Sequence, residues 1–247
     1  MPPLEILLVA LLFVVALLYS SVGHAGASGY LAVLAFFGLQ QAVAKPTALA
    51  LNILVATITV AQFARAGHFS WRILLPFLLG SMPLAFYGGS ITLPDYGYKL
   101  VVALVLLVAA YRLMMKAVPK DAVTKPPSLM VAVPTGAGVG LLAGLTGTGG
   151  GVFLTPLLLF FRWADTKAAA GVSAAFILGN SLAGLAGIYS KGNLLPWIEW
   201  TWLAAAGVGG AIGSYLGARK FESGLLRKLL GVALLVAVVK LVKESAN

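Results

Sequence analysis

Two short stretches of small and hydroxyl-bearing residues hold the groups best suited to bind a ligand. The first is Gly23–Gly29, and the second is Thr146–Gly151, which reads Thr-Gly-Thr-Gly-Gly-Gly. Glycine leaves the backbone amide uncovered and permits tight turns. A helix that starts directly after such a turn points its unbonded N–H groups and the positive end of its dipole into the turn. Such a turn can bind an anion without a fixed charge, and threonine hydroxyls would add further donors.

The second stretch differs from other glycine-rich anion motifs, because it lacks the Gly-Lys-Ser/Thr end of a Walker A loop and does not fit G-x-G-x-x-G. The alternative interpretation is a plain turn between two tightly packed helices. We predict substrate contacts from both stretches. The predicted residues are His24, Ser28 and Gly29 in the first, and Thr146, Thr148, Gly149, Gly150 and Gly151 in the second.

Ionisable and amide side chains near these stretches are few. His24 is expected at membrane depth, where such groups are costly and usually functional. It would donate to an anion or carry a proton in coupled transport; the alternative is a neutral histidine bonded to a carbonyl. Lys45 and Lys167 open the helices that follow and would attract an anion, one from each side, unless they simply extend to water. Asn52 and Asn180 lie inside the same helices and must bond to substrate or to backbone.

The elements that carry these residues must lie in lipid. Of the 247 residues, 60% are hydrophobic and only 10% are charged, whereas a soluble domain has roughly 25% charged residues. The chain cannot cover itself with polar surface, which predicts a multi-pass protein of the cell (inner) membrane. Cysteine is absent, so disulfides, thiolate metal sites and cysteine nucleophiles are excluded.

The net charge of +10 comes from residues placed between the apolar runs or near their ends. That placement indicates positive-inside topology and contact with anionic lipid head groups. A basic stripe with interleaved aromatic residues, as nucleic-acid binding would require, does not occur in the sequence.

Eight apolar runs are long enough to cross a bilayer as helices. They cover roughly residues 4–22, 43–64, 73–92, 98–115, 129–147, 168–189, 196–217 and 225–242. Two shorter runs, at about 29–39 and 151–161, each follow one of the small-residue stretches. The same order of long and short runs thus occurs twice. We predict an all-α integral membrane protein with repeats at 1–116 and 129–247 and a cytoplasmic linker at 117–128. Each repeat has four long transmembrane helices and one short broken helix after a Gly-rich loop.

Whether the short runs cross the bilayer decides how the repeats are related. If they cross, each repeat has five passes, the repeats are inverted, and the Lys and Arg residues divide twelve to five between the two sides. If they are re-entrant, the division is nine to eight. The positive-inside rule expects a bias, so we predict inverted repeats with both termini outside. Broken helices near mid-membrane recur in transporters of this design.

Two glycine series repeat every four residues and therefore share one helix face. They are Gly136, Gly140 and Gly144, and Gly209, Gly213 and Gly217. Such series are typical of close packing between membrane helices.

With these motifs in view, the chain resembles the sulfite exporter TauE/SafE family over nearly its whole length. Gly149-Gly150-Gly151 followed by Pro156 matches the family's Gly-Gly-Gly-x₄-Pro pattern, whereas the first half has Leu34 in place of the proline. The resemblance implies a carrier of sulfite, sulfoacetate, taurine-derived sulfonates or related small anions. It implies a substrate role for Thr148–Gly151 more directly than for His24–Gly29.

We predict an exporter of small sulfur-containing oxyanions that works by alternating access around a mid-membrane site, without a cofactor, a metal or enzymatic activity. Its partners are the anion and anionic lipid, with proton coupling left open, and it is a monomer or homodimer. The alternatives are a carrier of another small carboxylate or inorganic anion, and a non-transporting scaffold or assembly factor. An intramembrane enzyme has little support, because the spans hold no Cys, no HExxH and no Asp pair.

Overall fold

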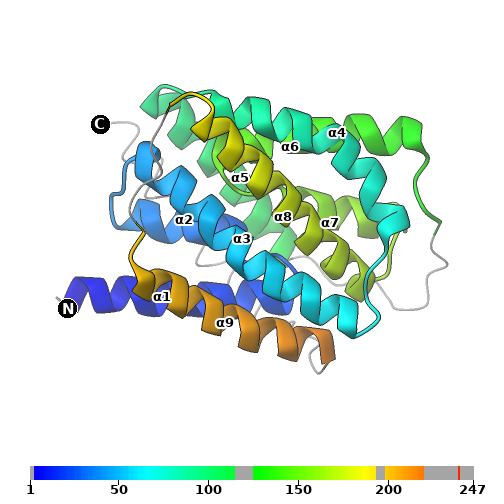
Figure 1. The fold of residues 1–247 in the computed structure, drawn as a ribbon, viewed down its shortest axis with the longest axis horizontal. Coiled ribbons are helices and arrows are strands. Elements are labelled where there is room, and N and C mark those ends of the chain that lie inside the picture. Colours follow the sequence, from blue (N-terminus) through cyan, green and yellow to red (C-terminus); the bar gives the residue numbers. More distant parts are fainter. Residues whose placement is uncertain (1–2, 115–124, 193–197, 220–238, 240–247) are drawn as a thin grey trace.

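The computed structural model describes an all-helical chain, apart from residues 1–2, 115–124, 193–197, 220–238 and 240–247 (Figure 1). The first half holds α1 (Pro3–Ser21), α2 (Ala27–Phe36), α3 (Gln41–Arg65), α4 (Trp71–Ser90) and α5 (Asp95–Met114). The second half holds α6 (Leu129–Thr146), α7 (Gly151–Phe160), α8 (Thr166–Tyr189) and α9 (Trp200–Arg219). This order confirms the predicted all-α class. Most of the predicted linker at 117–128, and all of the predicted run at 225–242 except Val239, lie outside the described residues.

Five of these helices are long and apolar enough to cross a membrane, namely α1, α3, α4, α6 and α8. Their outward surfaces are apolar, as shown by Leu79 and Met130, which are 67% and 90% exposed. A soluble protein rarely exposes so much apolar surface. The protein is therefore a multi-pass membrane protein, with lipid against these surfaces.

The short helices α2 and α7 have ten residues each, or about 15 Å, which is half of a typical hydrocarbon core. Each is preceded by a glycine in the left-handed region, Gly26 at φ 97° and Gly150 at φ 82°, with no side chain capping the helix. The two helices are also followed by the same kind of C-cap residue, Phe37 and Phe161. The sequence predicted both short helices, although α2 begins at Ala27 rather than Gly29 because the left-handed residue is Gly26.

Glycines bring two pairs of helices into backbone contact, as the two series predicted. A Cβ on any of the three α6 glycines would meet a carbonyl oxygen of α4, and one on any of the three α9 glycines would meet a carbonyl oxygen of α1. The pairs are Gly136 with Phe77, Gly140 with Ser81, Gly144 with Ala85, Gly209 with Phe13, Gly213 with Leu17, and Gly217 with Ser21. Because the numbers rise together, α4 is parallel to α6 and α1 is parallel to α9.

Further contacts fix the directions of the remaining long helices. Gly179 of α8 meets Leu78 of α4 and Gly187 meets Phe86, so α8 is parallel to α4. Gly207 of α9 meets Leu54 of α3, and Ala211 accepts a hydrogen bond from Gln62, so α3 is parallel to α9.

The central helices α3 and α8 are antiparallel, because Gly171 meets Phe63 whereas Gly184 meets Leu49. In Figure 1, α1, α3 and α9 run from left to right, and α4, α6 and α8 run from right to left. Helices at matching places in the two halves (α1 and α6, α3 and α8, α4 and α9) thus run in opposite directions.

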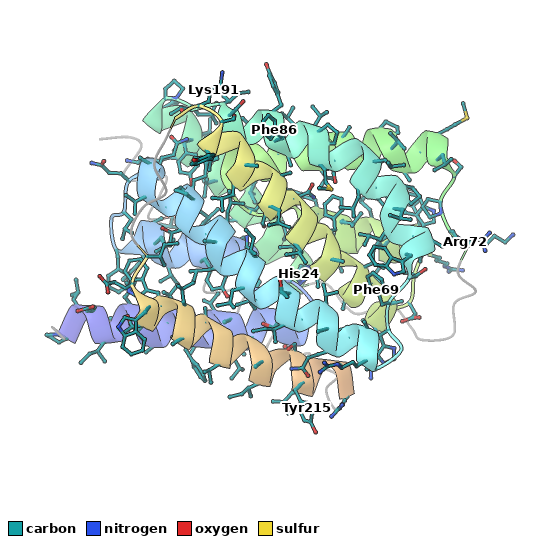
Figure 2. All side chains as sticks on the ribbon, in the orientation of Figure 1. His24, Phe69, Arg72, Phe86, Lys191 and Tyr215 are labelled. Atoms are coloured by element: carbon teal, nitrogen blue, oxygen red, sulfur yellow. The ribbon has the colours of Figure 1, made fainter. Side chains whose placement is uncertain are left out.

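Basic residues gather at one end of the bundle. The residues at that end are Arg65, Arg72, Lys125, Arg162, Lys167 and Arg219, and those at the other end are Lys45, Lys99 and Lys191. Figure 2 shows Arg72 and Lys191 at these opposite ends. The five-pass interpretation of the sequence assigns the same residues to the same two sides.

Candidate functional site

The loop before α7 (Thr146–Gly150, the second loop) lies halfway along the central helix α8. A Cβ on Gly149 would lie 2.7 Å from Ile177 Cγ2 and 3.0 Å from Ser181 Oγ, and these residues lie near the middle of the 24-residue helix. The loop also contacts the other half of the chain, because Asn52 Nδ2 of α3 donates to the Gly147 carbonyl at 3.5 Å. The second loop therefore lies deep in the bundle, between α3 and α8.

The backbone amides at the start of α7 are available to a ligand. The amides of Phe153 and Leu154 bond to the Gly150 carbonyl at 3.0 and 3.2 Å. Within the described part of the chain, the amides of Gly149, Gly150 and Gly151 have no acceptor. The positive end of the α7 dipole lies at the same place, so this helix start suits a negatively charged group.

The two threonines of the second loop bond to each other. Thr146 Oγ1 donates to the Leu142 carbonyl at 2.7 Å, so it accepts the proton of Thr148 Oγ1 at 3.0 Å. Tyr98 of α5 donates a hydrogen bond to the Thr146 carbonyl of the loop at 3.3 Å. Both threonine hydroxyl protons are therefore engaged in hydrogen bonds in this conformation. For either hydroxyl to donate to an anion, as predicted, the pair would have to give up one of these hydrogen bonds.

Buried polar atoms without partners surround the second loop. Asn180, Ser181 and Asn52 are all 0% exposed. Among the described residues, no partner is found for either polar atom of the Asn180 amide, for Ser181 Oγ or for Asn52 Oδ1. An unsatisfied buried polar group costs about 1–3 kcal/mol, so such atoms call for an explanation such as a ligand.

The position of Asn180 follows from its neighbours on α8. One turn before it, Phe176 contacts Gly150 of the second loop, and one turn after it, Gly184 contacts Gly144 at the end of α6. Residues four apart share one helix face. Asn180 therefore lies on the face of α8 that covers the second loop.

The two lysines lie at opposite ends of the bundle, and each caps a helix. Lys45 is only 4% exposed, and its Nζ donates to the carbonyls of Gly88, Gly89 and Ile91 at 3.3, 3.2 and 3.1 Å. Lys167 Nζ donates to the Ala218 carbonyl of α9 at 3.2 Å. The alternative that Lys45 extends to water is wrong, because burial and the last carbonyls of α4 hold its ammonium inside. Lys167 lies apart from the second loop.

The loop before α2 (Val22–Gly26, the first loop) is covered by aromatic side chains. Gly26 lies beneath the ring of Tyr30, whose buried hydroxyl has no partner among the described residues. The Ser28 and Tyr19 hydroxyl oxygens are 3.4 Å apart. The His24 ring is 8% exposed and packs edge-on to Tyr19, with ring centroids 6.4 Å apart. Figure 2 shows His24 between the two ends of the bundle.

The two loops contact different levels of α8. The first loop meets α8 at Ala170, through Gly23, and the second meets it at Ile177 and Ser181. These levels are roughly 10–16 Å apart along the helix axis. The structure thus brings Lys45, Asn52, Asn180 and the second loop together, and places His24, Ser28 and Gly29 in a separate group.

Sequence reasoning missed the three tyrosines, Tyr19, Tyr30 and Tyr98, that contact the loops. A local signal covers two of them, because Tyr19 and Tyr30 flank the first small-residue stretch, whereas Tyr98 opens an apolar run and carries no such signal. A phenolic hydroxyl inside a bundle needs a partner, which points to the loops.

Sequence comparisons find related proteins. A sequence model of the family described as sulfite exporter TauE/SafE matches residues 8–241. The chain belongs to the sulfite exporter TauE/SafE family. A relative from Sinorhizobium fredii (strain NBRC 101917 / NGR234), named "Probable membrane transporter protein y4hK", is similar to this TauE/SafE chain. The two are 43% identical over 234 residues, which cover 93% of this chain and 94% of the relative. No solved structure matches. The predicted family and the assignment to membrane transporters are confirmed.

Proposed function

We propose that this TauE/SafE family protein exports small sulfur-containing oxyanions, such as sulfite or organosulfonates, through a site at the second loop. The observation that carries the proposal is the meeting of two sets of unsatisfied groups. The amides of Gly149, Gly150 and Gly151 have no acceptor in the described chain, and the polar atoms of Asn180 and Ser181 beside them have no partner there. Amide and hydroxyl donors converging on one point suit an oxyanion.

The charge of the surroundings also favours an anion. Among the described buried residues, Lys45 is the one Lys, Arg, Asp or Glu, so no buried carboxylate offsets its charge. Its Cγ would lie 3.1 Å from a Cβ on Gly147. A cation would meet this charge and the positive end of α7 together, and both would repel it.

The directions of the helices support alternating access between inverted repeats. The parallel course of α1 and α3, both aligned with α9, favours α2 as a segment that returns the chain across the bundle. Five passes in each half would then invert the second half relative to the first, in agreement with the opposed helix directions. The second-loop residues are buried in this conformation, so one half must rock against the other to admit a solute.

Export of a monovalent anion needs no coupled ion. Moving one negative charge out of a negative interior is favoured by about 2.3 kcal/mol per 100 mV. The burial of His24 in the first loop leaves proton coupling as the second possibility, which a flux assay with an imposed pH gradient distinguishes from uniport.

The direct test is a flux assay on the purified protein in liposomes, with labelled sulfite and a panel of sulfonates, carboxylates and inorganic anions. We expect saturable sulfite flux out of the negative side that increases with the imposed potential. If the protein moves carboxylates or other anions but no sulfur oxyanion, the proposed substrate class is wrong. A folded protein that moves no anion would refute the transport function.

A substitution tests the location of the site. Asn180→Leu keeps the side-chain size and removes both polar atoms, so we expect sulfite flux at subsaturating concentration to fall by about tenfold or more, since about 1.5–3 kcal/mol of charged hydrogen bonding is lost. Ser81→Ala is the matched control. Its hydroxyl is also buried without a partner among the described residues, but it belongs to the α4–α6 interface. Equal flux in the two variants would move the site away from Asn180.

A further inference from the structure

Lys45 combines deep burial with a charge that is only partly compensated. Its hydrogen-bond partners are the carbonyls of Gly88, Gly89 and Ile91, and none of them is a carboxylate. The C-terminal end of a helix carries about half an elementary negative charge, so the end of α4 offsets only part of the lysine's charge. Buried charges in proteins are normally paired, which leaves a place for a negative group near Lys45.

The surroundings of Lys45 are those of the second loop. A Cβ on Gly147 would lie 3.1 Å from Lys45 Cγ and 3.4 Å from its Cα. Asn52, two turns further along α3, donates to the Gly147 carbonyl at 3.5 Å. At the end of α4, Gly89 lies against Gly184 of α8, one turn from Asn180. The ammonium therefore lies where α3, α4, α8 and the second loop meet.

Lys167 provides a natural comparison, because it follows α7 as Lys45 follows α2. It caps α9 through a single carbonyl, that of Ala218, at 3.2 Å. Its side chain is partly exposed, so water compensates its charge. The same capping arrangement thus holds a buried ammonium in the first half and a partly solvated one in the second half.

We infer that Lys45 is the residue that selects negatively charged solutes at the second loop, and that its ammonium passes from the end of α4 to the bound oxyanion. The inference rests on the proposed function. A lysine ammonium on its flexible stem can exchange partners. When it leaves, the last carbonyls of α4 lose the donor that satisfied them. Binding of the anion then releases the end of α4 from the Lys45 side chain, which links occupancy to movement of the helix end.

The first arm of the test compares Lys45→Met with Lys167→Met in liposomes, with sulfite as the probe. Met has a similar length and no charge. We expect Lys45→Met to raise the half-saturating sulfite concentration by about tenfold to a hundredfold, and Lys167→Met to raise it by less than about threefold. An unchanged value in folded Lys45→Met, or equal increases in both variants, would overturn the inference.

The second arm reads the helix movement and uses the absence of native cysteine in the chain. Ala42 at the start of α3 and Thr92 after α4 are exposed, so the A42C and T92C changes introduce a single pair for spin labels. With Lys45 present, saturating sulfite should shift the distance distribution between the labels, and Lys45→Met should abolish the shift. If Lys45→Met does not fold, the labelled protein that keeps Lys45 still tests the inference. An unchanged distance between its labels at saturating sulfite overturns the proposed transfer of the ammonium.

The two failures are distinguishable. If the unmodified protein moves no anion, the proposed function falls and this inference falls with it. If the unmodified protein moves sulfite and Lys45→Met does so with the same half-saturating concentration, only the role of Lys45 is lost.

Discussion

The first and second loops share a backbone design and differ in nearly every side chain around it. Both precede a ten-residue helix through a left-handed glycine. Beyond each helix the same hydrogen bonds recur 124 residues apart, such as Leu39 N to the Leu34 carbonyl and Trp163 N to the Leu158 carbonyl. Even the left-handed residue that follows each helix is matched, although it is Gly38 in one half and Arg162 in the other.

The side chains divide the two loops into different chemical settings. The ring of Tyr30 covers the first loop at Gly26, whereas Leu154 stands at the corresponding position of the second half. The second loop is bordered by Asn52, Asn180 and the buried Lys45. The comparison indicates that the repeated backbone supplies two buried helix starts, and that side chains make one of them suitable for an anion.

The helix interfaces provide the strictest test of equivalence between the halves. Gly140→Leu and Gly213→Leu each force a side chain into a neighbouring backbone carbonyl, so we expect each to lower the free energy of unfolding by about 3 kcal/mol or more. Thermal unfolding in detergent measures the effect. Gly138→Leu is the control, since a Cβ there meets nothing within 4 Å. A mild effect at one glycine and a severe one at the other would show that the two interfaces are unequal.

Alanine at the loop glycines tests whether both loops are equally constrained. Gly149 has φ +71° and contacts Ile177, and Gly26 has φ +97° and contacts Tyr30. We expect each Gly→Ala change to lower stability by about 2–4 kcal/mol, from left-handed strain and overpacking together. Gly38 has φ +74° with nothing near its Cβ position, so Gly38→Ala should lower stability by only about 1–2 kcal/mol. If Gly26→Ala behaves like Gly38→Ala, the tyrosine ring yields and the first loop is the more pliable one.

Tyr30→Phe should have the smallest effect and separates the roles of the two loops. The Tyr30 hydroxyl is buried without a partner in the described chain, so removing it should raise stability by about 1 kcal/mol. Sulfite flux should stay within about twofold if the anion binds at the second loop. A large loss of flux with normal unfolding would instead assign substrate binding to the first loop as well.

Periodicity and glycine placement predicted the fold well, because both are local properties of the chain. The glycines at 136, 140 and 144 share a face in any helix, and the structure places that face against α4. Short helices after the two glycine-rich stretches were expected because glycine turns tend to stop and start helices. The two interfaces do not repeat their glycines at equivalent positions of the two halves. The close-packing glycines lie on α6 in one interface and on α9 in the other, although these helices are not at matching places.

The candidate site was predicted in part. Asn52 and Asn180 were expected to need polar partners, and both lie beside the second loop. The bond between Thr146 and Thr148 and the ring of Tyr30 over Gly26 were not expected. Both contacts lie within four residues of the chain, but they depend on side-chain rotamers, which the residue pattern does not determine.

The sequence by itself determined that the chain lies in lipid, since too few charged residues exist to face water, and that a short helix follows each glycine-rich stretch, since glycine permits left-handed turns. The tertiary structure alone decided what surrounds each helix start. Lys45 and the carbonyls of Gly88 and Gly89 are more than 40 residues apart in the chain, and only the tertiary fold, which brings the end of α4 to the Lys45 side chain, removes that charge from water. Burial turns an ordinary lysine at the start of a helix into a charge that needs a counter-ion, and burial is a property of the assembled bundle.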